Sequence, residues 1–269
     1  MAACKKDLLH MADVKHYAKV YTYPCGVMDI VASSSPDFSE KGWEKSEDFS
    51  KPRRQAALPA KHERKSSDPQ GEDLERSMRR ARAKLRRLAL ANDFRWFVTL
   101  TLDPQKVDSH DGAAVVKKLN AWCSNMVQRQ GLKYILVPER HKKGGIHFHG
   151  FFSDCVKAVD SGHMDRQGHT VYNLPQWTLG FTTAIELYDD YQKAVGYVCK
   201  YVGKQGEKPA GRWYYSGGEL AEPPVEYVDI SPGELYEEYG NKAMLFYPPG
   251  KQIAVVNGIV LEQVQKENV

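Results

Sequence analysis

The chain has 269 residues, 42% of them hydrophobic, and its net charge at pH 7 is only +4. This length allows one substantial domain with appendages or two small domains, and the apolar fraction excludes a wholly disordered protein. No apolar run reaches the ~20 residues that a membrane-spanning helix requires. Five cysteines occur without a CxxC pair, which indicates reduced thiols rather than a disulfide framework. We therefore expect a cytoplasmic protein that is not embedded in a membrane.

The first of three predicted segments, residues 1–73, combines a small β element with a polar linker. Residues 20–23 (VYTY) and 27–31 (VMDIV) flank Pro24-Cys25-Gly26, which is typical of a hairpin turn. Residues 36–75 are rich in Ser, Lys, Glu, Asp and Pro and poor in aliphatic side chains. This composition predicts a linker with little core of its own.

Residues 72–91 predict a helix that carries a dense run of positive charge. Leucines at helical spacing are interspersed there with Arg79, Arg80 and four further basic residues between 82 and 87. A solvated helix surface and direct contact with DNA both explain such a run. Both interpretations remain open.

The second segment, residues 74–222, has the densest series of predicted elements. Strands are expected at 95–102, 133–139, 146–153, 181–187 and 211–216, helices at 111–130 and 189–204, and a loop-rich insertion at 154–180. The order β-α-β-β-(loop)-β-α-β predicts an α+β fold of the ferredoxin-like or RRM-like kind. In such a fold an antiparallel sheet has helices packed on one side. The third segment, residues 223–269, is a C-terminal extension that adds either strands or an oligomer contact.

The motif His147-Phe148-His149 lies in a predicted strand. Residues two apart in a strand face the same side, so both imidazoles project together while Phe148 points to the core. Two imidazoles on a rigid strand form half of a metal site. A pair of surface histidines without a ligand is the alternative for this motif alone.

Glu139 ends the preceding strand, and a polar Gly-terminated connector predicts a hairpin between the two. The pairing would bring a carboxylate oxygen to the two imidazoles. Two nitrogens and one hard oxygen suit Mn²⁺ or Mg²⁺ acting on a phosphate, although zinc also accepts these ligands. An ion pair of Glu139 with a basic residue of the connector (Arg140, Lys142 or Lys143) is the competing interpretation.

The predicted helix at 189–204 carries two phenols and three ammonium groups on one face, from Lys193, Tyr197, Lys200, Tyr201 and Lys204. A free tyrosine has a pKa of ~10, so a tyrosine nucleophile needs nearby positive charge or a polarised target. The lysines supply that charge. Amphipathic tyrosines with snorkelling lysines would give the same pattern.

A further strand pattern, FVTLTL at 97–102, places Thr99 and Thr101 on one face and aliphatic residues on the other. A central strand with hydroxyls on its solvent face explains this pattern without any function.

Together these motifs resemble those of the HUH endonucleases, the rolling-circle replication initiators of plasmids and phages. Residues 97–101 match the FxTLT strand of that family, His147-Phe148-His149 its His-hydrophobic-His strand, and residues 197–201 its YxxK or YxxxY helix. Several members take a third metal ligand eight positions before the first His, where Glu139 stands. The wording around these motifs is most similar to relatives of the filamentous-phage gene II protein, over about residues 75–218.

The resemblance implies a mechanism and its partners. Glu139, His147 and His149 would hold Mg²⁺ or Mn²⁺, which polarises the scissile phosphate of single-stranded or hairpin origin DNA. Tyr197 would attack, leaving a 5′-phosphotyrosyl enzyme and a free 3′-OH that a host polymerase extends. Lys200 would steady the site, and Tyr201 would be a second nucleophile or a structural phenol. No Walker A sequence is present, so unwinding is expected from a host helicase in the bacterial cytoplasm.

Two other functions would use the same residues. The predicted DNA contacts are Arg79, Arg80, Lys193 and Lys204. A non-catalytic module would bind single strands with these residues and stack bases on Trp96, Trp213, Tyr214 and Tyr215. A transposase or relaxase-type strand transferase would share the whole site and differ only in its substrate.

Overall fold

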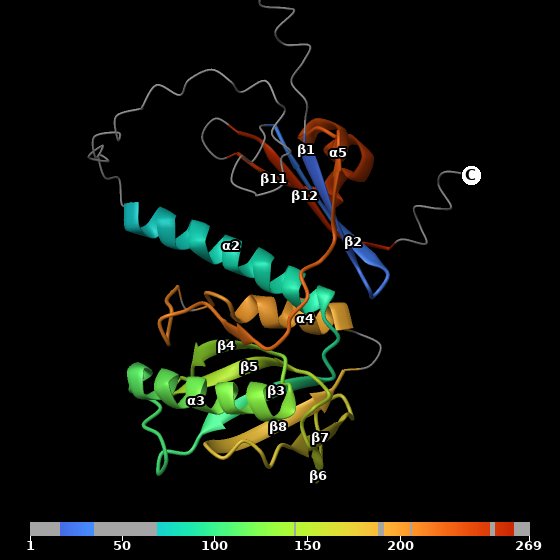
Figure 1. Ribbon diagram of the computed structural model, residues 1–269. Coiled ribbons are helices and arrows are strands. Elements are labelled where there is room, and N and C mark those ends of the chain that lie inside the picture. Colours follow the sequence, from blue (N-terminus) through green and yellow to red (C-terminus); the bar gives the residue numbers. More distant parts are fainter. Residues whose placement is uncertain are drawn as a thin grey trace, which may run out of the picture. The chain divides into compact units, whose positions relative to one another are not determined.

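The computed structural model describes residues 17–34, 69–142, 144–187, 191–204, 206–247 and 251–260. Its chain divides into two compact units (Figure 1). One unit comprises Met1–Tyr21, Met28–Asp73 and Val225–Val269, and the other comprises Thr22–Val27 and Leu74–Pro224. The predicted boundaries at 73/74 and 222/223 remain a prediction about domains, and each unit is described by itself below.

The larger unit is built on a seven-stranded sheet in the order β6-β7-β8-β3-β5-β4-β9. The strand pairs whose register is resolved are all antiparallel. The bounds in chain order are β3 (Trp96–Leu102), β4 (Tyr134–Arg140), β5 (Ile146–Phe152), β6 (Val159–Met164), β7 (Thr170–Asn173), β8 (Gly180–Glu186) and β9 (Tyr215–Gly217). Strand β5 lies in the interior of the sheet between β3 and β4, and both histidines of the motif are on this strand.

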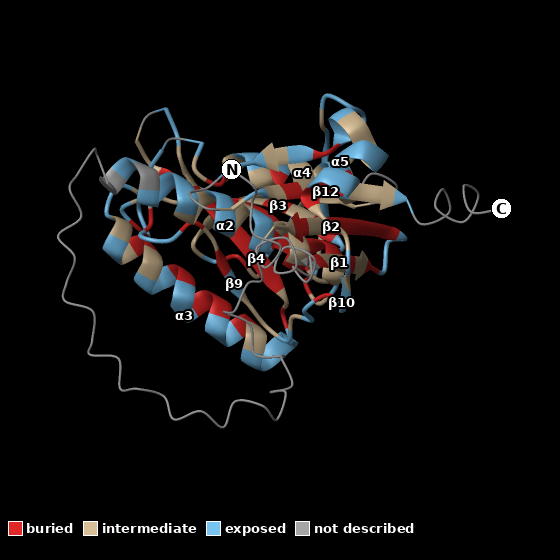
Figure 2. Ribbon diagram, turned by 90° about the horizontal axis from the view of Figure 1, so that it is seen from above, coloured by how far each residue is buried: buried red, intermediate tan, exposed pale blue. Residues whose placement is uncertain are grey.

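Helix α3 (Gly112–Gln130) covers one face of this sheet. It begins at Asp111, whose carboxylate accepts hydrogen bonds from the backbone of Ala113 and Ala114, and it ends at Gly131 in the left-handed conformation. Its buried residues form a stripe at helical spacing, visible in Figure 2, that packs on the apolar side chains of the strands. This stripe consists of Val115, Leu119, Trp122, Cys123 and Met126.

Helix α4 (Tyr191–Tyr201) lies on the opposite face, over β4 and β5. Phe97 and Phe151, which alternate with the residues facing α3, contact Tyr197 and Tyr191 of this helix. Helix α2 (Pro69–Ala91) packs against α4 (Figure 1). The Tyr191 hydroxyl donates to the carbonyl of Ala89 at 2.5 Å, and Arg82 Nε donates to the carbonyl of Val202 at 2.9 Å.

The α+β class with an antiparallel sheet is confirmed, with differences in detail. Helices cover both faces of the sheet rather than one, because β4 and β5 are almost entirely buried and need cover on each side. The expected loop at 154–180 contains the hairpin of β6 and β7, which extends one edge of the sheet. The helix expected to reach 204 ends at Tyr201, and the strand expected at 211–216 covers only Tyr215–Gly217.

The smaller unit is a five-stranded sheet whose strands come from both ends of the chain, in the order β10-β1-β2-β12-β11. Its bounds are β1 (Tyr17–Tyr23), β2 (Val27–Ser33), β10 (Val225–Val228), β11 (Met244–Phe246) and β12 (Ile253–Val260), with α5 (Pro232–Tyr239) and the short 3₁₀ helix η1 (Gly240–Lys242). The predicted hairpin at 20–31 is present, with Gly26 at φ 76° in its turn. Of the two alternatives for residues 223–269, the addition of strands is the one that this sheet contains.

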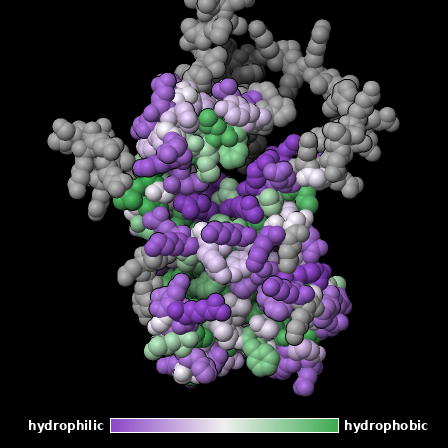
Figure 3. All heavy atoms as spheres, turned by 180° about the vertical axis from the view of Figure 1, so that it is seen from behind, coloured by the Kyte–Doolittle hydropathy of each residue, from purple (hydrophilic) through white to green (hydrophobic). Residues whose placement is uncertain are grey.

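None of the helices in the described residues is both long and apolar enough to cross a bilayer. In the view from behind, hydrophilic side chains dominate the surface and hydrophobic ones form small scattered groups (Figure 3).

Candidate active site

The hairpin of β4 and β5 sets the geometry of the site. Its register places Glu139 directly opposite His147 and Val137 directly opposite His149. The connector closes through hydrogen bonds from the His141 amide to the carbonyl of Gly145, at 2.8 Å, and from the Gly144 amide to the carbonyl of His141, at 2.7 Å. Directly opposed residues of an antiparallel pair point to the same face. The carboxylate of Glu139 therefore lies above both imidazoles.

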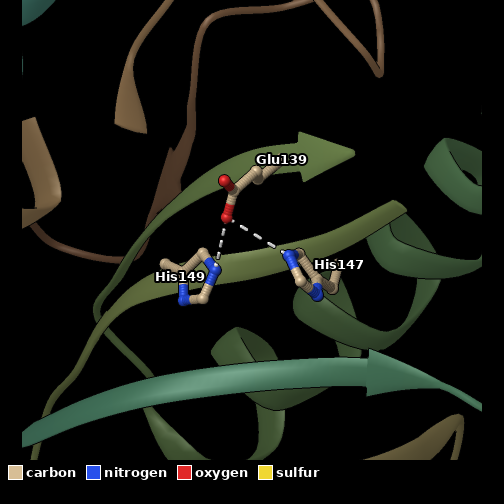
Figure 4. A group of neighbouring side chains, drawn as sticks. All are labelled: Glu139, His147 and His149. Carbon is tan, nitrogen blue, oxygen red and sulfur yellow. Dashed lines mark hydrogen bonds and ion pairs between the residues drawn. The ribbon is translucent and has the colours of Figure 1, made fainter. Parts of the chain in front are cut away.

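These three side chains converge on one point (Figure 4). Glu139 Oε2 lies 2.9 Å from His149 Nε2 and 3.2 Å from His147 Nε2. One ligand atom from each residue lies within 4.8 Å of the other two. The side chains are only 11 to 16% exposed. Two imidazole nitrogens and a carboxylate oxygen at this spacing are a donor set that a divalent ion accepts. The expected Glu/His/His group is present, and the sequence does not identify its metal.

Thr99 holds the ring of His149 from the neighbouring strand. Its hydroxyl lies 3.1 Å from Nδ1 of His149, and β3 pairs with β5 so that these two residues are directly opposed. A ligand histidine whose second ring nitrogen is hydrogen-bonded keeps its orientation and its tautomer. Thr99 therefore fixes Nε2 of His149 toward Glu139.

The pKa values of the group favour metal binding at neutral pH. Burial, together with the neighbouring His147, lowers the pKa of His149 to about 4. His149 is thus uncharged at pH 7, and its nitrogen lone pair is available. Burial acts to raise the pKa of Glu139, but hydrogen bonds from Lys204 and His147 outweigh it and hold that pKa below the usual range. Glu139 is therefore a carboxylate at neutral pH.

Both candidate tyrosines lie beside this group. The ring of Tyr201 stacks on the ring of His149, with centroids 4.1 Å apart, and its hydroxyl donates to the Tyr197 oxygen at 2.5 Å. Tyr197 is 48% exposed and contacts Phe97 edge to face. Burial, and then the hydrogen bond to Tyr197, raise the pKa of Tyr201. The more accessible of the two phenols is Tyr197.

The lysines near α4 occupy different surroundings. Lys204, in the turn after α4, places Nζ 2.6 Å from Glu139 Oε1 and 5.0 Å from the centre of the Tyr201 ring. Lys200 is exposed, lines a shallow pocket with Arg82 and Cys199, and makes no hydrogen bond or ion pair with the described residues. Both tyrosines satisfy the YxxK spacing, Tyr197 with Lys200 and Tyr201 with Lys204. The structure brings Lys204, and not Lys200, to the Glu/His/His group.

The remaining predicted DNA contacts lie on α2 and α4. Arg80 is exposed, while Arg79 pairs with Glu75 at 2.7 Å. Lys193 is exposed on α4. Part of the basic run has a structural role, because Arg82 joins α2 to the end of α4 through the carbonyl of Val202. These positions leave solvation and DNA contact both compatible with the helix.

Most of the aromatic residues considered for base stacking are in the core. Trp96, Trp213 and Tyr215 are 4 to 8% exposed, so their rings are not available to a base. Tyr214 is partly buried.

The sequence analysis missed two residues near this site. It did not assign a role to Thr99, although the place of this residue in the FxTLT motif was the signal. It also did not single out Phe181, whose ring is 66% exposed on β8.

The comparisons with known proteins agree with this geometry. Residues 95–206 match the family model of the replication-associated proteins ORF2 and gene II protein. Neither a search of curated proteins nor a search of solved structures found a match. The matched segment includes Thr99, the Glu/His/His group and both tyrosines. Residues 95–206 of this chain therefore belong to the ORF2 and gene II family of replication-associated proteins.

Proposed function

We propose that the protein initiates rolling-circle replication of a bacterial mobile element by nicking and rejoining single-stranded origin DNA. The observation that carries the proposal is the convergence of Glu139, His147 and His149 beside two hydrogen-bonded tyrosines. A metal ligand set and a nucleophile within one small region are what a phosphodiester transesterification requires. Membership of a replication-associated family supports the same substrate class.

The donor set fits a divalent ion, Mg²⁺ or Mn²⁺. The three ligand atoms face one another, and the uncharged His149 and ionised Glu139 are in the protonation states that a ligand needs. A bound ion would supply Lewis-acid polarisation of the scissile phosphate. The protein's own contribution is to hold the three donors rigid on paired strands, with Thr99 orienting His149.

Tyr197 is the proposed nucleophile. Its oxygen forms a bond to phosphorus while the bond from phosphorus to the 3′ oxygen breaks, giving a 5′-phosphotyrosine and a 3′ end that takes up a proton. The Tyr201 hydroxyl donates to the same oxygen, which stabilises the phenolate as Tyr197 loses its proton. The phosphodiester energy is kept in the covalent bond, so the 3′-OH of a second strand reverses the reaction without ATP.

Tyr201 is proposed as the second nucleophile or as the partner that activates the first. Its raised pKa disfavours it as the initial phenolate. Once Tyr197 is esterified, the hydroxyl of Tyr201 is the phenol nearest to the product phosphate. This order leaves the two phenols with consecutive roles.

Lys204 is proposed to take the part that the resemblance gave to Lys200. Its ammonium group meets the carboxylate of Glu139 and lies against Tyr201, where it stabilises negative charge on a phosphate or a phenolate. Lys204→Met and Lys200→Met form a matched pair of variants on neighbouring turns. We expect the Lys204 variant to lose about 10- to 100-fold in nicking rate, and the Lys200 variant to change little. Equal losses in both would contradict this assignment.

The direct test of the proposed function is covalency. Purified protein is incubated with labelled single-stranded origin DNA, with and without Mn²⁺, and separated on a denaturing gel. Wild type, Tyr197→Phe, Tyr201→Phe and His147→Ala are compared side by side. We expect a metal-dependent protein–DNA adduct that is lost in Tyr197→Phe and His147→Ala and retained in Tyr201→Phe.

The other outcomes each carry a definite meaning. Loss of the adduct in Tyr201→Phe alone would move the first nucleophile to Tyr201. Tight binding of the origin strand by wild type without any adduct would instead support a non-catalytic binding module. An adduct formed equally well in EDTA would contradict the metal requirement.

A further inference from the structure

The row of residues that contains His147 continues across the sheet to an exposed aromatic side chain. Glu139 is directly opposite His147, His147 is opposite Thr101, and Thr101 is opposite Phe181 on β8. Opposed residues of antiparallel strands point to one face. Phe181 therefore lies on the same face as the Glu/His/His group, two strands away from His147. With strands ~4.8 Å apart, that separation is about 10 Å along the sheet.

Helix α4 leaves this part of the face uncovered. It lies over β4 and β5, where Tyr197 meets Phe97 and Tyr201 stacks on His149. Further along β3 and β8, three side chains on this face are all exposed, those of Thr101, Phe181 and Thr183. Within the described part of this unit, no helix packs on these three residues. We call Thr101, Phe181 and Thr183 the open patch.

The location of Phe181 distinguishes it from an ordinary exposed apolar residue, since single ones are common on protein surfaces and need no explanation. Its ring is 66% exposed between threonine hydroxyls, on the sheet face that carries the candidate metal group. An exposed aromatic ring provides a stacking surface for a nucleobase, and hydroxyls donate to phosphate oxygens. The open patch therefore combines the two contacts that a nucleotide uses.

We propose that the open patch is a binding site for one nucleotide of the single-stranded substrate, with its base stacked on Phe181. This inference rests on the proposed function, because it names where the strand beside the cut lies. It also gives the protein an exposed stacking residue, a role for which Trp96, Trp213 and Tyr215 are too buried.

The order of the rows assigns the nucleotide to one side of the cut. Along β3, Phe97 faces Tyr197, Thr99 faces the His149 row, and Thr101 faces the His147 row that reaches Phe181. Phe181 is thus beyond the metal group as seen from Tyr197. In-line displacement places the leaving oxygen opposite the nucleophile. The stacked base therefore belongs to the strand on the 5′ side of the cut, which ends in the freed 3′-OH.

The test is a binding measurement that needs no catalysis. Fluorescence anisotropy in EDTA measures the affinity of labelled single-stranded origin DNA for wild type, Phe181→Ala, Phe181→Trp and Met164→Ala. Met164 is a matched control because it is 72% exposed on β6 of the same sheet. We expect Phe181→Ala to weaken binding by about 5- to 100-fold, Phe181→Trp to restore it, and Met164→Ala to match wild type.

A scan of abasic nucleotides identifies the stacked base. Removing one base on the 5′ side of the cut should weaken wild type and leave Phe181→Ala unaffected, because the variant has already lost that contact. Identical abasic profiles in the two proteins, or coupling only on the 3′ side of the cut, would overturn the proposal.

The adduct gel with Mn²⁺ reports the proposed function separately. A wild-type adduct together with unchanged binding by Phe181→Ala would contradict the stacking site alone. Weakened binding by Phe181→Ala without a wild-type adduct would contradict the nicking function, and it would support Phe181 as a DNA contact.

Discussion

At the scale of single residues, the candidate metal site depends on an uncharged His149. Its pKa is about 4 in the folded protein, against about 6.5 for an unperturbed histidine. Between these two values the unfolded chain binds a proton that the folded chain does not. The free energy of unfolding should therefore be largest above pH 6.5 and fall by about 3 kcal/mol as the pH drops toward 4.

This pH dependence is measured by urea denaturation in EDTA between pH 7.5 and 4. We expect His149→Gln to remove most of the decrease, because Gln has no proton to gain in this range. His163→Gln is the matched control, since His163 is exposed. The lowered pKa of Glu139 adds to the loss only below pH 4.5, the ordinary value for a glutamate. An unchanged slope in His149→Gln would contradict the assignment.

Thr99 should matter through His149 and not through the fold. Thr99→Val removes the hydroxyl that lies 3.1 Å from Nδ1 of His149 while keeping the β-branched shape. We expect an affinity for Mn²⁺ that is about 10- to 100-fold lower, as is typical when a partner of a ligand histidine is lost. Thr99→Ser should retain the affinity. Isothermal titration calorimetry measures both, and equal affinities for wild type and Thr99→Val would refute this role.

The sequence predicts the ligands more readily than their supports. His147 and His149 are two apart on one strand, and Glu139 precedes a short Gly-terminated connector, so strand alternation and hairpin closure are local signals. The contact between Thr99 and His149 depends on the register between β3 and β5, which are separated by α3 and β4.

The lysines of the site show the same limit of sequence reasoning. Helical spacing grouped Lys200 with Lys204 on one face of the predicted helix. The helix ends at Tyr201, and the turn at Gly203, with its φ of 72°, sends only Lys204 to Glu139. The point at which a helix ends thus decides which lysine reaches the ligands.

At the scale of the elements, the sheet requires a close approach at Gly150 on β5. A Cβ atom at this position would lie 1.8 Å from the carbonyl oxygen of Ile135 on β4. Gly150→Ala should therefore push the two central strands apart and cost about 3 kcal/mol of stability. The two strands carry all three ligands, so metal affinity should fall as well.

Gly196 in α4 provides the opposite case. A Cβ atom there meets nothing within 4 Å, and alanine is the better helix former. Gly196→Ala should raise the free energy of unfolding by about 1 kcal/mol. Urea denaturation of both glycine variants measures the contrast, and a destabilised Gly196→Ala would show that α4 has no room at this face.

The elements that the sequence predicts well are those with a buried side. Strands β3, β4 and β5 and helix α3 have strong apolar patterns because each packs into the core. Strand β6 is exposed along most of its length, so its residues lack an apolar alternation, and the insertion was expected to be a loop. Its pairing with β7 depends on backbone hydrogen bonds and not on side-chain burial.

At the scale of the whole molecule, the small sheet depends on strands from both ends of the chain. β1 pairs with β10, and β2 lies next to β12. Deleting residues 248–269 removes β12, which lies between β2 and β11 in the sheet. We expect the amides of β2 to lose protection from hydrogen exchange, while those of β3 and β5 in the larger unit keep theirs. Loss of protection in both units together would contradict their separate stability.

The pairing of distant strands could not be predicted from the sequence. The hairpin of β1 and β2 has a local turn signal at Pro24-Cys25-Gly26, but its neighbours in the sheet, β10 and β12, begin only at Val225 and Ile253. Neither a motif nor a spacing links them. The division into three segments was therefore drawn without knowing that strands of the first and third share one sheet.

This arrangement also fixes an order of events on the ribosome. Strand β2 ends at Ser33, and its neighbour β12 begins only at Ile253. At ~5–20 residues per second, the first hairpin waits roughly 10 to 45 s for the strand that completes its sheet. All of the proposed catalytic residues lie between these two strands and emerge during that interval. The larger unit can therefore assemble its site while the nascent small sheet still has open edges.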